Sequence, residues 1–298
     1  MSFFLLPSFI LKKQKIDQAL KELIDSYEEN TPLKKAIEYA ISNGGKRIRP
    51  IIVLMIQEAL KCPYSLIDAA ISIELFHTAS LIADDLPLMD NDSERRNLPS
   101  THVQFGDTVA LLASYGLIAL SFEKIHDCSR YIREFDEKHE KFSYKACSLA
   151  LKAASYSAGF KGATLGQFYD LFPDATCEIE KLIYLKTITL FEVTFLFGWI
   201  FAGGSISEID EVKKLSYHLG MAYQIADDIN DLEDDLKKDK KVNYAISCGI
   251  ESAFDKFQFH FEEMKKGIKD LGLNTQDFDC LISFLEKLVI KENKSLLI

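Results

Sequence analysis

Apolar residues recur at spacings of three and four along most of the chain, which is the period of a helix that packs on one side. No segment sustains the apolar and polar alternation of a half-buried strand. The pattern predicts helices over residues 16–27, 32–43, 50–60, 65–85, 107–127, 143–159, 175–202, 207–236, 240–266 and 275–292. The predicted fold class is therefore all-α.

Two apolar stretches bear on the class of protein. Residues 65–85 are apolar nearly all round, which predicts a central helix. Residues 182–202 are long enough to cross a membrane, but they contain Lys186 and Glu192, whose charges would be costly in a bilayer. We therefore expect a buried core helix and not an integral membrane protein. With 298 residues and 48% hydrophobic content, the chain is predicted to form one large domain, 1–298.

Composition narrows the functional classes. The formal net charge of −10 argues against binding to nucleic acid or to an acidic membrane surface, because both need clustered positive charge. The six cysteines show no Cys-x-x-Cys spacing, so neither a zinc knuckle nor a disulfide framework is predicted. The N-terminus, MSFFLLPSFI, lacks the basic region and cleavage site of a signal peptide. We expect a cytoplasmic protein.

Two clusters of aspartates carry the candidate chemistry. The first is DDLPLMD, residues 84–90, at the end of the central helix, and the second is DDIND, residues 227–231, inside a later helix. On a helix, residues 227 and 231 lie one turn apart on the same face. Carboxylates so placed repel one another unless a cation lies among them, and hard oxygen ligands suit Mg²⁺. Neither cluster has the glycine and distal glutamate of an EF-hand.

A simpler interpretation is that each cluster is only a charged helix end. Asp84 and Asp85 argue against it, because negative charge at a helix C-terminus opposes the macrodipole. Basic residues also accompany the clusters: GGKRIRP, residues 44–50, and the pair Arg95-Arg96. Arginine forks and lysine ammonium groups bind phosphate oxygens. The combination predicts a site for a metal and a diphosphate.

The order of these motifs resembles that of the short-chain trans-isoprenyl diphosphate synthases. The shared pieces are GGKRIRP, DDLPLMD followed by Arg95-Arg96, Gly166-Gln167 with Asp170, Lys186-Thr187, and YQIADDIND ending at Asp231. The resemblance implies the isoprenoid synthase fold, a single-domain helical bundle around a deep central cavity. It also implies a homodimeric, magnesium-dependent prenyltransferase that joins isopentenyl diphosphate to allylic diphosphates.

The resemblance assigns roles to individual residues. The implied ligands of three magnesium ions are Asp84, Asp85, Asp90, Asp227, Asp228 and Asp231. Arg95, Lys186 and Lys241 would contact the allylic diphosphate. Lys46, Arg49, His77 and Arg96 would bind isopentenyl diphosphate. Thr187 and Gln224 would stabilise the allylic cation by their dipoles, and the departing diphosphate would take the final proton.

Helix geometry gives His77 independent support. A histidine on an apolar helix is more often a satisfied core residue. Residues seven apart, however, lie two turns along one face, which places His77 beneath Asp84. Gln224 and Asp228 likewise share a helical face.

Product length in this family depends on what closes the cavity below Asp84. The resemblance identifies the gate as the fifth residue before it, Ala79, while helix geometry places Ser80 more directly beneath. A small gate predicts geranylgeranyl diphosphate, the C20 product, from dimethylallyl, geranyl or farnesyl diphosphate. Tyr115 on the next helix would restore a floor, so farnesyl diphosphate, the C15 product, is the alternative.

Several features depart from the family pattern or bear on competing interpretations. Ala83 stands where many relatives have histidine, and the loop containing Lys237, Lys238 and Lys241 is short. A terpene cyclase or a head-to-head synthase would share the fold, but neither needs the GGKRIRP loop. A regulatory subunit of a heteromeric synthase would typically lose one aspartate motif, and this chain keeps both.

Overall fold

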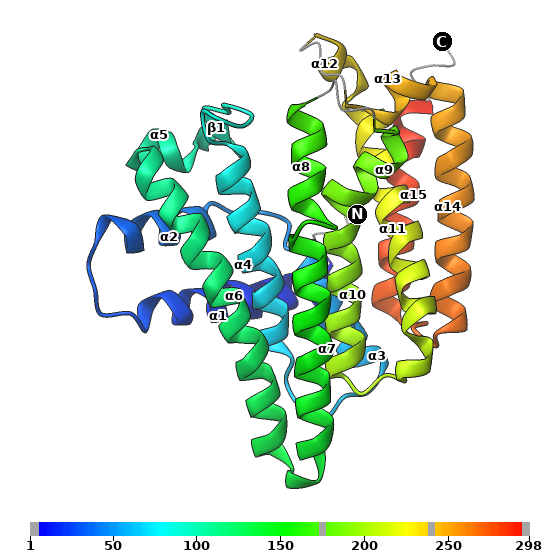
Figure 1. The fold of residues 1–298 in the computed structure, drawn as a ribbon. Helices are drawn as coiled ribbons and strands as arrows, with labels where there is room; N and C mark the ends of the chain where they lie inside the picture. The colour runs from blue at the N-terminus through cyan, green and yellow to red at the C-terminus, as the bar shows by residue number, and fades with distance from the viewer. Residues whose placement is uncertain (1–5, 173–176, 238–241, 294–298) are drawn as a thin grey trace. The chain divides into compact units, whose positions relative to one another are not determined.

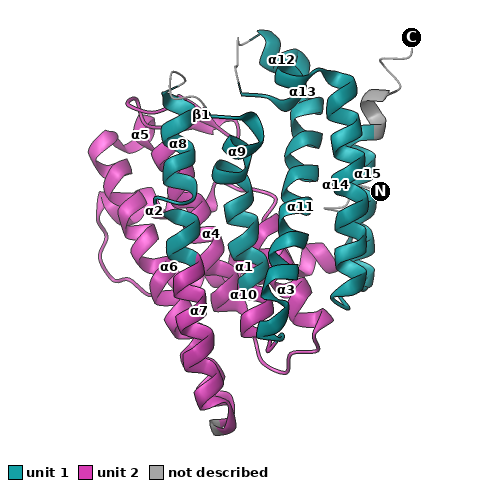
Figure 2. Cartoon of the chain, turned by 45° about the vertical axis from the view of Figure 1, so that its right-hand side comes forward, with its two compact units in different colours: residues 1–6, 154–196, 204–298 teal, residues 7–153, 197–203 magenta. Residues whose placement is uncertain are grey.

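The structure is a computed structural model that describes residues 6–172, 177–237 and 242–293. In these ranges the chain is almost wholly helical, and its only strands form the short hairpin of β1 (Glu94–Arg95) and β2 (Leu98–Pro99) (Figure 1). The predicted all-α fold class is confirmed. The chain divides into two compact units (Figure 2). We call residues 7–153 with 197–203 the N-terminal unit, and residues 1–6, 154–196 and 204–298 the C-terminal unit. The single domain over 1–298 stays a prediction.

The N-terminal unit contains the first aspartate motif and the basic loop. Its helices are α1 (Pro7–Asp25), α2 (Pro32–Ser42), α3 (Ile48–Ala59), α4 (Ile67–Asp84), α5 (Thr101–Phe105), α6 (Asp107–Phe135), the 3₁₀ turn η2 (Glu137–His139) and most of α7 (Glu140–Ala158). As predicted, Thr31 caps α2, accepting a hydrogen bond from the Lys34 amide at 3.2 Å, and Pro32 opens the helix.

Helix α4 is the central helix that the apolar stretch predicts. It packs against α3, α6 and α1, and most of its residues are buried. The helix ends at Asp84, and Asp85 caps it. Asn91, in the segment after α4, has a positive φ, as do Arg96 and Asn97, the two residues between β1 and β2. The hairpin lies next to the end of α4, as the contacts of Asp85 below show.

The C-terminal unit contains the second aspartate motif. Its elements are the end of α7, α8 (Ala163–Leu171), α9 (Ile179–Ile183), the π-helical turn η3 (Tyr184–Ile188), most of α10 (Thr189–Phe201), the 3₁₀ turn η4 (Ile206–Glu208), α11 (Ile209–Asn230), α12 (Leu232–Lys237), α13 (Tyr244–Cys248), α14 (Ile250–Asp270) and α15 (Gln276–Asn293).

Some predicted boundaries are wrong for local reasons. The helix predicted over 175–202 changes to π-helical geometry at η3. The helix predicted over 240–266 is divided at Gly249, which has a φ of 85°. Helix α1 begins at Pro7, well before residue 16. Apolar period alone does not register such changes in backbone geometry.

Two helical stretches, Asp107–Phe135 and Ile179–Phe201, are long and apolar enough to span a membrane by length and composition alone. In the second, 78% of the apolar window is buried, which is the burial expected of a core helix. In the first, which is α6, only 33% is buried.

Candidate active site

The first aspartate motif folds back on the end of α4. The backbone amide of Asp90 donates to the carbonyl oxygen of Asp84 at 2.9 Å, so the two residues lie next to each other. Asp84 is half-buried and Asp90 is exposed, whereas Asp85 is only 3% exposed. The first and last carboxylates of the motif are therefore the ones that face solvent.

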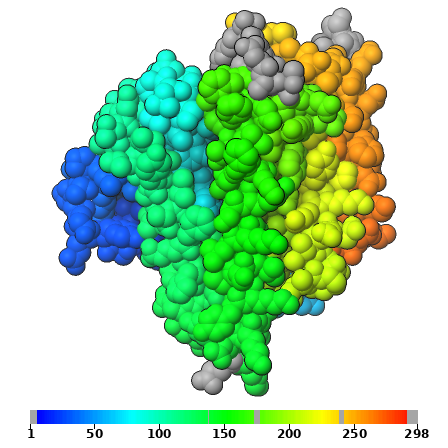
Figure 3. Space-filling view, in the orientation of Figure 1, coloured from blue at the N-terminus to red at the C-terminus, as the bar shows by residue number. Residues whose placement is uncertain are grey.

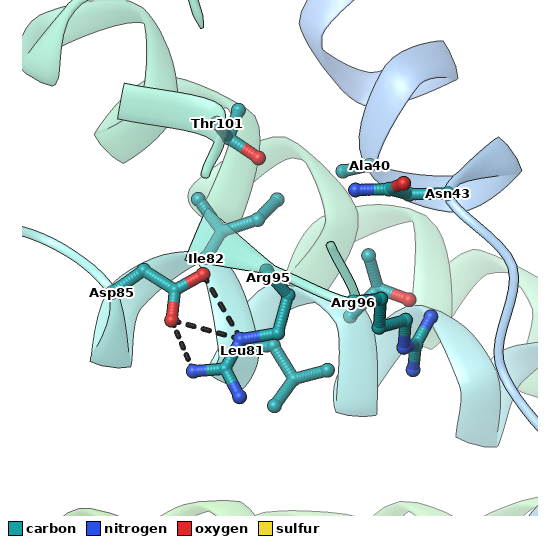
Figure 4. A pocket seen from close by; sticks show the side chains of 9 residues that line it. Ala40, Asn43, Leu81, Ile82, Asp85, Arg95, Arg96 and Thr101 are labelled. Atoms are coloured by element: carbon teal, nitrogen blue, oxygen red, sulfur yellow. Dashed lines mark hydrogen bonds and ion pairs between the residues drawn. The ribbon is translucent and has the colours of Figure 1, made fainter. Parts of the chain in front are cut away.

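Asp85 is held by Arg95 of β1. Nε of Arg95 donates to both carboxylate oxygens of Asp85, at 3.0 and 3.2 Å, and Nη2 donates to Oδ1 (Figure 4). Burial raises the pKa of Asp85 above its ordinary value although Arg95 acts to lower it, and the hydrogen bond that Arg95 donates to Asp85 raises the pKa of Arg95. The forked contact with the guanidinium favours the ionised carboxylate. Asp85 therefore holds the motif in place, while Asp84 and Asp90 face solvent.

Arg96 contacts the basic loop directly. Its Nη1 donates to the carbonyl oxygen of Gly44. A Cβ atom at Gly45 would lie 2.7 Å from this nitrogen, and Gly45 has a φ of 113°, so only glycine suits the position. A small pocket lies beside this contact, and Asn43, Asp85, Arg95, Arg96 and Thr101 are among its lining residues (Figure 4). The structure thus brings together two segments that were predicted to bind isopentenyl diphosphate.

His77 lies in the same cationic region. It is half-buried on α4. Its pKa is well below the ordinary value, first because of burial and then because of the positive charges of Arg49 and Arg96. A neutral imidazole has one donor and one acceptor nitrogen, so His77 can donate to a phosphate oxygen without adding charge. Of the other predicted ligands, Lys46 is exposed and Arg49 is half-buried.

The second aspartate motif lies at the end of α11 with a similar burial pattern. Asp227 is half-buried, Asp231 is exposed, and Asp228 is 5% exposed. Oδ1 of Asp228 accepts from Nε2 of Gln224 at 2.8 Å, and Oδ2 accepts from the Tyr244 amide at 2.8 Å. Gln224 Oε1 in turn accepts from the Thr187 hydroxyl at 3.0 Å. The chain Thr187, Gln224, Asp228 orients three predicted site residues.

Asn243 is a support that the sequence pattern does not predict. It is fully buried, and its Nδ2 donates to the Asp228 carbonyl oxygen at 2.8 Å and to Oδ2 of Asp235 at 3.0 Å. Its Oδ1 accepts from the Ile246 amide and so caps α13. An asparagine before a helix start is a recognisable capping signal, but its distant partners are not readable locally. Lys241, a predicted diphosphate ligand, lies outside the described residues.

Lys186 and Thr187 lie in the π-helical turn η3. The Thr189 amide donates to the Tyr184 carbonyl oxygen, five residues earlier. Lys186 forms an ion pair with Asp170 of α8. A Cβ atom at Gly166 would lie 2.8 Å from the backbone nitrogen of Lys186, so α8 approaches the turn closely. A π turn changes the direction of carbonyl groups and is often found at functional sites.

The predicted chain-length residues differ in their exposure to solvent. Ala79 is buried, and its carbonyl oxygen accepts from the Ser114 hydroxyl of α6 at 2.9 Å. Ser80 is half-buried and donates to the His77 carbonyl oxygen. Tyr115 is 60% exposed. Ser114 of α6 therefore contacts Ala79, while a role for Tyr115 stays a prediction.

The carboxylates fit a hard divalent cation by their chemistry. Each motif offers two accessible aspartates and one buried aspartate that is already hydrogen-bonded. Among the described residues, no three acidic, histidine or cysteine side chains form a preassembled metal cage. Mg²⁺ suits such an arrangement, because it keeps several waters and shares its other positions with substrate phosphates.

Comparison with known sequences places these motifs in context. The profile of the family described as Polyprenyl synthetase matches residues 30–252. Geranylgeranyl pyrophosphate synthase 4 from Arabidopsis thaliana is 36% identical over 296 residues, covering 93% of this chain and 74% of that protein. Farnesyl diphosphate synthase from Geobacillus stearothermophilus is 32% identical, covering 88% of this chain and 91% of that protein.

Solved structures agree. An FPP/GFPP synthase from Zymomonas mobilis superposes with a TM-score of 0.76 at 28% identity, covering 93% of this chain and 95% of that one. A geranyltranstransferase from Thermotoga maritima superposes with a TM-score of 0.73 at 31% identity, covering 95% and 99%. The fold is that of the isoprenoid synthases, as predicted.

Proposed function

Because this chain belongs to the polyprenyl synthetase family and is a trans-prenyltransferase, we propose that it adds isopentenyl diphosphate to allylic diphosphates and ends at the C20 product, geranylgeranyl diphosphate. One observation carries the elongation reaction in particular. Arg96 is hydrogen-bonded to the GGKRIRP loop. Arg49 and Arg96 are among the cations that lower the pKa of His77. All these residues lie in the unit that contains Asp84 and Asp90. A cyclase would not need this second diphosphate-binding site, which does not depend on metal.

The chain's own residues account for binding and orientation. Asp84 and Asp90, with Asp227 and Asp231, would hold the three expected magnesium ions, and these ions, when bound, neutralise the diphosphate that departs. Asp85 and Asp228 keep the motifs in place through their buried hydrogen bonds. This division of roles follows from the burial of the two central carboxylates.

Cationic and dipolar groups complete the proposed reaction. Lys186, Arg95 and Lys241 would contact the allylic diphosphate, and Asp170 orients Lys186. The allylic carbon–oxygen bond breaks, and the hydroxyl of Thr187 and the amide oxygen of Gln224 stabilise the cation. The double bond of isopentenyl diphosphate then attacks, and a proton passes to the released diphosphate. Dimethylallyl, geranyl and farnesyl diphosphates are the proposed primers.

The reaction is tested with purified protein, Mg²⁺, isopentenyl diphosphate and each of the three primers separately, with products identified by mass. A C20 diphosphate from every primer is the expected result. A C15 end point would contradict the open gate at Ala79 and establish the farnesyl alternative. Intact substrates in every reaction would contradict the proposed elongation activity itself.

We further propose that a second copy of this chain covers the outer face of α6. Leu112, Tyr115 and Ile118 recur at helical spacing and are exposed, as are Tyr144 and Leu151 of α7. Segment 107–135 lies at the surface along its length (Figure 3). Monomers rarely expose such a row of large apolar side chains, and isologous dimers are the commonest assembly. Light scattering should give the dimer mass, and Leu112→Glu should yield monomers; a monomeric parent protein would refute this.

A cytoplasmic location is also proposed. It is supported by six cysteines that are all free thiols, since a reducing compartment keeps thiols unpaired. The 78% burial of the apolar window in Ile179–Phe201 supports a protein that is not embedded in a membrane. Fractionation of cells that express the chain should recover it with the soluble proteins.

A further inference from the structure

Arg47, in the middle of the GGKRIRP loop, is buried. It is 5% exposed, precedes the first residue of α3 and has a φ of 54°, which is uncommon for a residue with a side chain. Nε donates to Oδ1 of Asp17 at 2.9 Å, and Nη1 donates to Oε1 of Glu74. Nη2 donates to the Ile41 carbonyl oxygen at 2.6 Å. All three guanidinium nitrogens are therefore engaged inside the protein.

The partners of Arg47 come from three other helices. Asp17 lies on α1, Ile41 is in the last turn of α2, and Glu74 lies on α4 one turn before His77. Burial by itself would lower the pKa of Arg47, but Glu74 and Asp17 reverse the direction and raise it. Glu74 is only 2% exposed, so each of the two groups provides the charge that the other needs.

This arrangement sets the position of the neighbouring loop residues. Lys46 precedes Arg47 directly, and Arg49 follows it by two residues. On the other side, the Gly44 carbonyl oxygen accepts from Arg96. The loop is thus attached to α1, α2 and α4 through Arg47 and to the hairpin through Arg96. A shift of the Arg47 attachment would move Lys46 and Arg49 relative to His77.

We propose that Arg47, with Glu74, is a positioning residue for isopentenyl diphosphate, which it does not itself contact. The proposal rests on the proposed elongation activity. Its distinct consequence is selectivity: loss of the attachment weakens isopentenyl diphosphate binding and leaves the allylic diphosphate site, built from other residues, nearly unchanged. A buried ion pair that served the fold alone would have no such preference for one substrate.

The test uses the double variant Arg47→Met with Glu74→Met in the full chain. Because both charges are removed together, no buried charge is left unpaired, and thermal stability should stay near that of the parent. We expect KM for isopentenyl diphosphate to rise ~10-fold or more, since small displacements of binding groups have large effects. KM for geranyl diphosphate should change less than about 2-fold, because the residues that bind the allylic diphosphate would not be displaced.

A matched control is available in the same unit. Lys12 of α1 is 6% exposed and pairs at 2.7 Å with Glu58, which is next to the last residue of α3. Lys12→Met should lower thermal stability without changing either KM. Should the double variant not fold, Glu74→Gln, which keeps the shape and removes one charge, provides the same comparison of the two KM values.

The outcomes separate the two proposals. An active parent protein whose folded variants keep the parent KM for isopentenyl diphosphate would overturn the positioning role of Arg47. An equal rise of both KM values would also overturn it, because the effect would then be general. A parent protein without condensation activity would instead overturn the proposed function.

Discussion

The two aspartate motifs are alike in burial but differ in what holds the buried carboxylate. In the N-terminal unit, Asp85 is held by the Arg95 guanidinium, which is itself about one third exposed. In the C-terminal unit, Asp228 is held by the neutral Gln224 amide and by a backbone amide. Both carboxylates lie at helix C-termini, where negative charge is unfavourable. One motif compensates with an opposite charge, and the other with hydrogen bonds from its own helix and from the start of α13.

This difference predicts unequal sensitivity to mutation. A carboxylate that depends on one cation becomes an uncompensated buried charge when the cation is removed. A carboxylate with two neutral donors keeps one of them after a single substitution. The first motif should therefore be the more fragile.

The largest expected effect comes from Arg95→Met. Asp85 would keep its burial and lose its partner, so the free energy of unfolding should fall by ~3 kcal/mol. The catalytic rate should fall ~100-fold, because the allylic diphosphate would lose the Arg95 guanidinium and Asp84 and Asp90 would lose their support. Urea unfolding and kcat measure the two effects. Adding Asp85→Asn should recover much of the stability but not the rate; an Arg95→Met protein as stable as the parent would contradict the ion-pair account.

A fall in pH should have an intermediate effect on the free energy of unfolding. The groups responsible lie in the C-terminal unit. His218 and His260 are buried, with their Nδ1 atoms 2.9 Å apart. Burial is the largest cause that lowers both pKa values. For His260, the neighbouring His218 and the positive Lys256 lower the pKa as well and Glu180 raises it, and together these effects give a pKa of about 4. Around His218, Glu263 and Lys214 act in opposite directions.

The sign of this effect follows from proton uptake. The pair is neutral when folded, whereas the unfolded histidines protonate near 6.5. Stability is therefore complete above about pH 6.5 and is lost as the pH falls toward 4, with ~2 kcal/mol lost by about pH 5. Urea unfolding at about pH 7.5 and about pH 5 should show this loss, and His260→Gln should flatten it. Hydrogen exchange should show α11 and α14 losing protection first; an unchanged slope in the variant would exclude the pair as the cause.

The smallest effect is expected from Gln224→Met. It removes the Gln224 amide donor to Asp228 and the acceptor of the Thr187 hydroxyl, while the Tyr244 amide remains. The free energy of unfolding should fall by ~1 kcal/mol and kcat by ~10-fold. Calorimetry and steady-state rates test this directly. A loss of stability larger than that of Arg95→Met would reverse the comparison between the motifs.

Much of the fold and part of the site were predictable from the sequence. Local spacing identified both aspartate motifs, the glycine-opened basic loop and the central helix α4, because each depends on residues within a few turns. The shared face of Gln224 and Asp228 became a 2.8 Å hydrogen bond. The π turn η3 was not predictable, because its close packing with Gly166 depends on another helix.

The pattern of apolar residues by itself determined that the chain is helical, and the order of its motifs determined the family. Tertiary structure decided which charged residues hold others in place. In the sequence, Arg47 is one of several cations in a basic loop, but in the structure it is paired with Glu74, 27 residues away. Asp228 likewise accepts a hydrogen bond from the amide of Tyr244, 16 residues away. The physical reason is that a local pattern specifies which face of a helix is apolar. The residue that pairs with a buried charge depends on which helix packs against that face, and this is determined only by the tertiary structure.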